Sequence, residues 1–103
     1  MVKLEKKRYL KILVELEGGG GLGQEEFKHA VYEAVFSLLG EQGASKAWVQ
    51  VKNFDEREQI GIVKCSLREI ERVIASLAGK TSFRGKKIAL RLQKISGAIG
   101  RLG

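Results

Sequence analysis

Three glycines with the spacing of a nucleotide-binding loop lie in the stretch VELEGGGGLGQEEF, residues 14–27. Gly18, Gly20 and Gly23 satisfy G-x-G-x-x-G, a pattern in which N–H groups at a helix N-terminus bind pyrophosphate. Two glutamates occupy the first helical turn after the glycines, and their charge would repel a phosphate. A dinucleotide-binding domain also needs two βαβαβ halves, which 103 residues cannot supply. The pattern therefore predicts a flexible strand-to-helix connection.

The residues that could act as catalytic groups are few. His29 is the only histidine, and it lies on the flank of a predicted helix. Cys65 is the only cysteine, and its alternation with Val63 points it to the core, where a thiol is inert. The paired acidic residues are explained by helix starts, a turn and a solvated helix face. We expect no catalytic residue, no metal site and no cofactor on this chain. A small enzyme or ligand-binding regulator is the alternative, and it would need a pocket with converging polar groups.

The excess of positive over negative charge is confined to the last third of the sequence. The net charge is +7, with 19 basic and 12 acidic residues. Residues 72–103 contain eight of the basic residues and no acidic residue. Such a one-sided field attracts polyanions and favours nucleic acid as a partner. Solubility alone is the other explanation for the charge.

Apolar periodicity predicts four strands and two helices in the order βαββαβ. The predicted strands are 8–17, 46–54, 59–65 and 88–95, and the predicted helices are 24–40 and 66–79. Right-handed crossovers would place both helices on one face of a four-stranded antiparallel sheet with strand order 4-1-3-2. We therefore expect an α+β, ferredoxin-like or RRM-like sandwich. It forms a single domain, 1–103, with a short C-terminal tail from about residue 96.

Local signals refine the two helices. The apolar stripe of the first helix includes Leu38, and Gly40 or Gly43 can end that helix. Ser66 and Glu69 fit the S-x-x-E capping box at the start of the second.

The sheet face opposite the helices is expected to be open and to bind a protein partner. Its predicted partner-binding residues are Tyr9, Trp48, Phe54, Ile60 and Ile62. Ile60 and Ile62 occupy positions where RNA-recognition motifs carry base-stacking aromatics. Aliphatic side chains lack an extended π-face, so protein contact is favoured over the middle of the face and RNA at its basic margin. The alternative is that the C-terminal tail folds over this face.

Two basic groups are predicted to contact RNA phosphates. Pairing of the first and last strands would bring the N-terminal basic residues close to the C-terminal ones. The predicted RNA-binding residues of this group are Lys6, Lys7, Arg8, Arg91, Lys94 and Arg101. A second group lies at the opposite edge and consists of Lys80, Arg84, Lys86 and Lys87.

Four stretches give the chain a family resemblance over residues 8–102. They are RYLKILVE, AVYEAVFSLLGEQGASKAWVQV, FDEREQIGIVKCSLREIERV and GKKIALRLQKISGAIGRL. Together they resemble the ribonuclease P protein component 2 family, the small protein subunits of archaeal and eukaryotic RNase P. Lys64 stands where the family usually has arginine, and Ala98 where threonine is common.

The resemblance implies a noncatalytic subunit of a ribonucleoprotein that removes the 5′ leader of precursor tRNA. RNase P RNA, with bound Mg²⁺, would carry the chemistry, and RNase P protein component 3 would be the protein partner.

The sequence lacks a run of about 18 apolar residues and a secretory h-region. We therefore expect a cytoplasmic protein without a membrane partner. The alternative function is an independent RRM-like module that binds single-stranded RNA.

Overall fold

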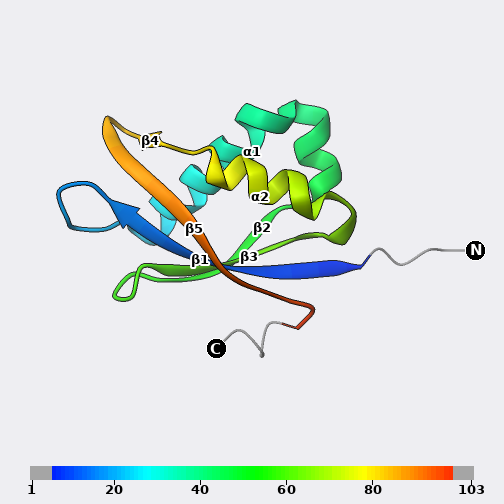
Figure 1. The fold of residues 1–103 in the computed structure, drawn as a ribbon, viewed down its shortest axis with the longest axis horizontal. Coiled ribbons are helices and arrows are strands. Elements are labelled where there is room, and N and C mark those ends of the chain that lie inside the picture. Colours follow the sequence, from blue (N-terminus) through cyan, green and yellow to red (C-terminus); the bar gives the residue numbers. More distant parts are fainter. Residues whose placement is uncertain (1–5, 99–103) are drawn as a thin grey trace, which may run out of the picture.

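The computed structural model describes residues 6–98 and contains five strands, two α-helices and a 3₁₀ turn. In chain order these elements are β1 (Lys7–Leu16), α1 (Gln24–Ala47), β2 (Gln50–Asp55), β3 (Ile60–Ser66), the 3₁₀ turn (Leu67–Glu69), α2 (Ile70–Ala78), β4 (Ser82–Phe83) and β5 (Lys86–Ser96). Both helices lie on the same side of the curled sheet (Figure 1). The predicted α+β class with two helices is confirmed.

The sheet has five strands in the order β2-β3-β1-β5-β4, and every pairing is antiparallel. The predicted four-stranded sheet of order 4-1-3-2 is not confirmed, because β4 adds a fifth strand beyond β5. The sequence interpretation assigned this segment to a turn-rich connection. Arg84 and Gly85, with φ of 51° and 81°, make a two-residue hairpin turn that pairs β4 with β5.

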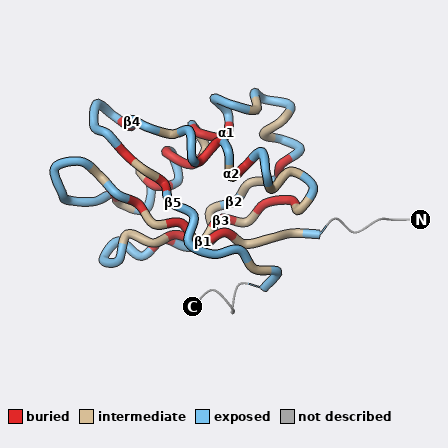
Figure 2. The backbone as a smooth tube through the Cα atoms, in the orientation of Figure 1, coloured by how far each residue is buried: buried red, intermediate tan, exposed pale blue. Residues whose placement is uncertain are grey.

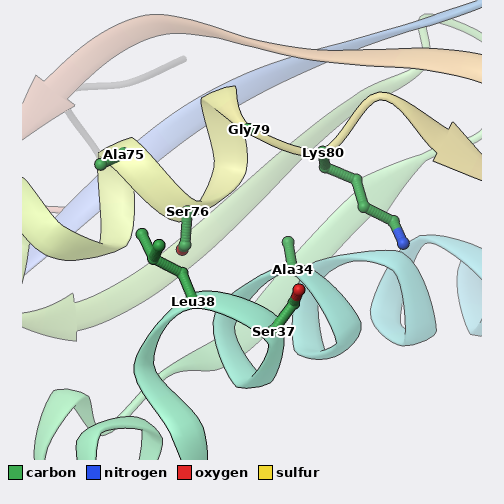
Figure 3. A pocket seen from close by; sticks show the side chains of 7 residues that line it. All are labelled: Ala34, Ser37, Leu38, Ala75, Ser76, Gly79 and Lys80. Carbon is green, nitrogen blue, oxygen red and sulfur yellow. The ribbon is translucent and has the colours of Figure 1, made fainter.

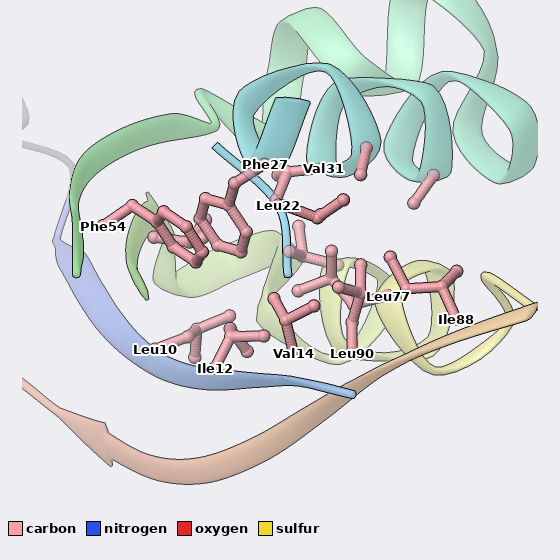
Figure 4. Packing of buried hydrophobic residues seen from close by; sticks show 14 of the residues in the cluster. Leu10, Ile12, Val14, Leu22, Phe27, Val31, Phe54, Leu77, Ile88 and Leu90 are labelled. Carbon is pink, nitrogen blue, oxygen red and sulfur yellow. The ribbon is translucent and has the colours of Figure 1, made fainter. Parts of the chain in front are cut away.

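The hydrophobic core fills the space between the helices and the sheet (Figures 2 and 4). Its β1 contribution is Leu10, Ile12 and Val14, whose alternation gives one buried face. Phe27 of α1 stacks on Phe54 of β2, with 4.3 Å between ring centroids. Burial of each such side chain stabilises the fold by about 1.5–3 kcal/mol.

Phe54 lies in the core, so its predicted place on the open face is wrong. The side chain is only 4% exposed. The pairing of β2 with β3 shifts register between Val51 and Asn53, which leaves Lys52 as an extra residue. Such a β-bulge reverses the alternation, so both Val51 and Phe54 turn towards the helices. The three-residue spacing of these two apolar side chains is the sequence signal of the bulge.

Gly61 of β3 provides the space for the aromatic stack. It pairs with Phe54 across the strands and is buried. A Cβ atom at this position would collide with the Phe27 ring. A strand residue larger than glycine would therefore push Phe27 out of its place in the core.

Gly40 divides α1 without ending it. Its φ of 71° and ψ of −179° lie in a region that only glycine adopts readily. Helical structure resumes and continues to Ala47, so the predicted strand 46–54 begins later, at Gln50. Leu38, predicted to face the core, is 57% exposed just before the break.

α2 begins after a 3₁₀ turn, later than the periodicity predicts. Ser66 precedes that turn and makes no side-chain capping hydrogen bond. The predicted capping box with Glu69 is therefore not formed, and α2 itself begins at Ile70.

The glycine loop is attached to the β2–β3 turn by one side chain, Gln59. Its Oε1 accepts a hydrogen bond from Leu22 N at 2.8 Å, and its Nε2 donates to Leu22 O at 3.0 Å. The N–H of Gly23 donates to Glu26 Oε1 at 2.9 Å. Protein side chains thus occupy N–H groups that a phosphate would require, in agreement with a connecting role for the loop.

Candidate functional site

The sheet face opposite the helices carries an apolar patch made of Tyr9, Leu13, Ile60 and Ile62. Within residues 6–98, both helices pack on the other side (Figure 1). The register places Leu13 opposite Ile60. All four side chains are half-buried. The predicted positions of Tyr9, Ile60 and Ile62 on one face agree with this register.

Four lysines lie on the same sheet face as this patch, Lys11 among its side chains, and form what we call the open-face lysine cluster: Lys7, Lys11, Lys64 and Lys94. The register sets Lys11 opposite Lys94 and Tyr9 opposite Lys64. A shift between Lys11 and Ile12 leaves Gln93 as an extra residue in β5. This bulge brings Lys94 to the open face. The predicted RNA-binding set lacks Lys11 and Lys64, although strand alternation signals both.

Arg91 and Arg8 also belong to the first predicted basic group. Arg91 Nε forms an ion pair with Glu15 Oε1 at 2.5 Å. Arg8 follows the alternation to the helix side and donates to Lys7 O at 2.9 Å. Its guanidinium lies beside Gly97 at the end of β5. Lys6 is exposed, and Arg101 lies outside the described residues.

In the second predicted basic group, two of the four residues, Lys80 and Arg84, form ion pairs with glutamates of α1. Lys80 Nζ donates to Glu33 Oε1 at 2.7 Å, and this hydrogen bond lowers the pKa of Glu33. Arg84 lies 3.5 Å from Glu26 Oε2. Both cations therefore tie the segment after α2 to α1. Lys86 and Lys87 are exposed at the start of β5.

Trp48 directly follows α1 as its C-cap residue. The sequence interpretation, which placed it in a strand, is wrong. It adopts the left-handed conformation, with φ of 53° and ψ of 46°. The residue is 61% exposed, and Lys7 Nζ lies 4.6 Å from the centroid of its ring. Lys64 Nζ lies 5.9 Å from the Tyr9 centroid, which gives this end of the face a second cation–aromatic contact.

Two pockets lie on the helix side. The one in Figure 3 has a volume of about 150 Å³ and lies between α1 and α2, where Lys80 already pairs with Glu33. The other, of about 240 Å³, is mostly apolar and lies beside the Gly40 break. Its lining includes Tyr32 and Phe36. Neither pocket brings together the polar groups that the ligand-binding alternative requires.

The single cysteine and histidine do not converge on a reactive centre. Burial raises the pKa of the Cys65 thiol to about 11, so the thiol is protonated at neutral pH. His29 is exposed on α1, with Nδ1 3.4 Å from Arg84 Nη2. Among residues 6–98, no three His, Cys, Asp or Glu side chains are grouped to hold a metal. In the same range neither helix is long and apolar enough to cross a membrane.

Over residues 6–98 the fold and this face define an α+β sandwich protein with a lysine-rich antiparallel sheet whose second face the helices leave uncovered. The Rpp14/Pop5 family matches residues 8–102, and the chain belongs to that family. This confirms the resemblance found in the sequence.

Relatives with assigned names support the same family. Ribonuclease P protein component 2 of Pyrococcus furiosus is 35% identical over 98 residues, which cover 95% of this chain and 80% of that protein. The protein of the same name from Thermococcus gammatolerans is 37% identical with the same coverage. Mouse ribonuclease P protein subunit p14 is 30% identical over 89 residues, covering 85% of this chain and 72% of that protein.

A solved structure supports the fold independently of sequence. A chain in the cryo-EM structure of yeast ribonuclease MRP superposes with a TM-score of 0.75 at 9% identity. The match covers 95% of this chain and 79% of that chain. At this identity the likeness concerns the fold alone.

Proposed function

We propose that this chain is a noncatalytic protein subunit of ribonuclease P. It binds the RNase P RNA and a partner protein, RNase P protein component 3. Through that complex it supports removal of the 5′ leader from precursor tRNA. Family membership supports the assignment, because several relatives carry the name ribonuclease P protein component 2.

The observation that carries the RNA-binding part is the open-face lysine cluster. Lys11 and Lys94 oppose each other on adjacent strands, and Lys7 and Lys64 lie on the same face. Several cations on one surface gain most when they bind the closely spaced phosphates of a polynucleotide. Lys86 and Lys87 provide a second, smaller basic surface at the other end of β5.

The apolar patch supports the protein-binding part. Ile60 and Ile62 together with Leu13 present aliphatic surface beside Tyr9, and such a surface favours burial by a protein. In the proposed assembly the partner covers the aliphatic part of this patch, while the lysines on the same face reach RNA beside it. The RNA and its Mg²⁺ carry the cleavage chemistry, and this chain binds no cofactor of its own.

Reconstitution tests the proposal. RNase P RNA, component 3 and precursor tRNA are combined with and without this chain, and the rate of 5′-leader removal is measured. We expect the full chain to increase that rate. The double variant Lys11→Glu/Lys94→Glu should lose most of the gain, whereas Lys28→Glu on the exposed flank of α1 should retain it. No gain from the wild-type chain, with every component folded, would contradict the proposal.

Partner binding is tested separately. The double variant Ile60→Ala/Ile62→Ala should weaken association with component 3 while the chain stays folded. Thr81→Ala, at an exposed position after α2, is the control. If component 3 binds the double variant as tightly as the wild type, the apolar patch is not its docking surface.

The exposed Trp48 with its lysine contact favours a second candidate, an independent single-stranded RNA-binding module. This candidate predicts that the chain alone binds RNA as tightly as the chain with its partner. A large gain in RNA affinity on adding component 3 would favour the subunit instead.

A further inference from the structure

The backbone at Trp48 is held in a conformation that a bulky residue rarely adopts. Its φ of 53° is typical of glycine or asparagine at a helix end. The preceding Ala47 is fully buried, whereas Trp48 is 61% exposed. Core packing therefore does not explain why a large aromatic side chain occupies this position. A strained, exposed aromatic residue of this kind indicates a functional constraint.

A lysine lies over the indole, and a second lysine lies over the nearby Tyr9 ring. Lys7 Nζ lies 4.6 Å from the ring centroid, and Lys64 Nζ lies 5.9 Å from the centroid of Tyr9, two residues farther along β1. Because Gln50 pairs with Lys64, the start of β2 carries Trp48 towards the same end of the sheet. We call these four residues, Lys7, Tyr9, Trp48 and Lys64, the Trp48 corner.

We propose that the Trp48 corner binds an unpaired nucleotide of RNA. The base stacks on the indole, and the neighbouring phosphates contact the ammonium groups of Lys7 and Lys64. Every base has a π-face, so an aromatic ring beside cations binds single strands with little sequence preference. Trp48 stays 61% exposed although Lys7 lies over its ring, so a second planar group has room to stack.

The charge of the corner favours RNA over a protein as the occupant. A protein hot spot around tryptophan is usually depleted of lysine. Here lysines lie over both aromatic rings, and Lys46 is exposed in the last turn of α1. This inference rests on the proposed RNA-binding function and specifies the kind of RNA segment that the corner takes.

Intrinsic fluorescence provides a direct readout, because Trp48 is the only tryptophan in the sequence. The full chain is titrated with a short single-stranded oligouridylate and with a blunt-ended RNA duplex of equal length. We expect the single strand to quench Trp48 fluorescence and the duplex to leave it nearly unchanged. Unchanged fluorescence at saturating single strand would overturn the proposal.

Substitution tests the same contact. Trp48→Asn removes the ring but suits the left-handed backbone, so the fold is retained. We expect it to weaken single-strand binding by about 5- to 150-fold, equivalent to about 1–3 kcal/mol for one stacked base. Trp48→Tyr should restore much of that affinity. Phe36→Ala, which removes another exposed aromatic ring on α1, should leave it unchanged.

The outcomes separate the two proposals. If Lys11→Ala/Lys94→Ala weakens binding to both RNAs while Trp48→Asn weakens neither, RNA binding stands and the stacking site is wrong. If the wild-type chain binds neither RNA, with or without component 3, the proposed RNA-binding function itself fails. If component 3 abolishes the quenching of Trp48 by the single strand, the corner belongs to the protein partner and the nucleotide site is overturned.

Discussion

Lys11 of β1 and Lys94 of β5 are directly opposite each other, so two ammonium-bearing side chains share one cross-strand position. Like charges in this arrangement destabilise a sheet. The bulge at Gln93 produces the pairing, because without it the alternation would turn Lys94 to the helix side. In the proposed RNA complex, a phosphate bound between the two lysines would offset this cost.

Removing both charges should weaken RNA binding without weakening the fold. In Lys11→Ala/Lys94→Ala we expect the slope of log K against log salt to become less negative by about 2 for duplex RNA, about 1 per lost phosphate contact. The affinity for RNA is measured over a range of salt concentrations, with Lys28→Ala as control. A slope equal to that of the wild type would mean that neither lysine contacts phosphate.

Phe54 should matter for stability and not for partner binding. Phe54→Ala deletes one ring of the Phe27 stack, and we expect it to lower the free energy of unfolding by about 3–5 kcal/mol. Ile62→Ala on the half-buried open face should cost much less. Urea denaturation of both variants measures the difference. Similar costs for the two substitutions would contradict the assignment of Phe54 to the core.

Strands β1 and β2 show where sequence patterns predict side-chain direction correctly and where they fail. Uninterrupted alternation in β1 correctly predicts the buried face of Leu10, Ile12 and Val14. The same rule fails at Phe54, because one inserted residue reverses every side chain beyond it.

Long-range contacts set a second limit on prediction. The ion pair between Lys80 and Glu33 joins residues 47 positions apart, so a solvated cation and a paired one look alike in the sequence. Gly40 illustrates the same limit, because glycine signals both a helix end and a break within a helix. Gly85 signals a turn in the sequence, but the strand that this turn pairs with β5, β4, is only two residues long and has no periodicity to predict it.

Gly61 should not tolerate a side chain. In Gly61→Ala the new Cβ meets the Phe27 ring, and we expect a loss of about 1–3 kcal/mol from overpacking. Gly97→Ala is a matched control, since its Cβ would be at ordinary contact distance, 3.5 Å, from Arg8 Nη1. Thermal unfolding compares the two variants. Equal stability of Gly61→Ala and the wild type would show that the stack does not need this space.

Cys65 should make stability fall at alkaline pH. Burial raises the pKa of its thiol from 9.0 to about 11. The contribution of the buried thiol to the free energy of unfolding is fully present below pH 9. It is lost as pH rises towards 11, because in this range the thiol of the unfolded chain releases its proton and that of the folded chain does not.

The contribution of Cys65 is isolated by comparison with Cys65→Ala. The free energy of unfolding of both proteins is measured across this pH range. We expect the wild type to lose more stability than the variant. Parallel pH profiles would rule out the buried, protonated thiol.

Lysine footprinting of the assembled complex tests most directly whether the open sheet face binds RNA. The chain, with component 3, is acetylated in the presence and absence of RNase P RNA, and the modification of each lysine is quantified. We predict that RNA protects Lys11, Lys64 and Lys94, while Lys28 on α1 remains reactive. Protection of Lys28 with continued reactivity of the three open-face lysines would contradict the account.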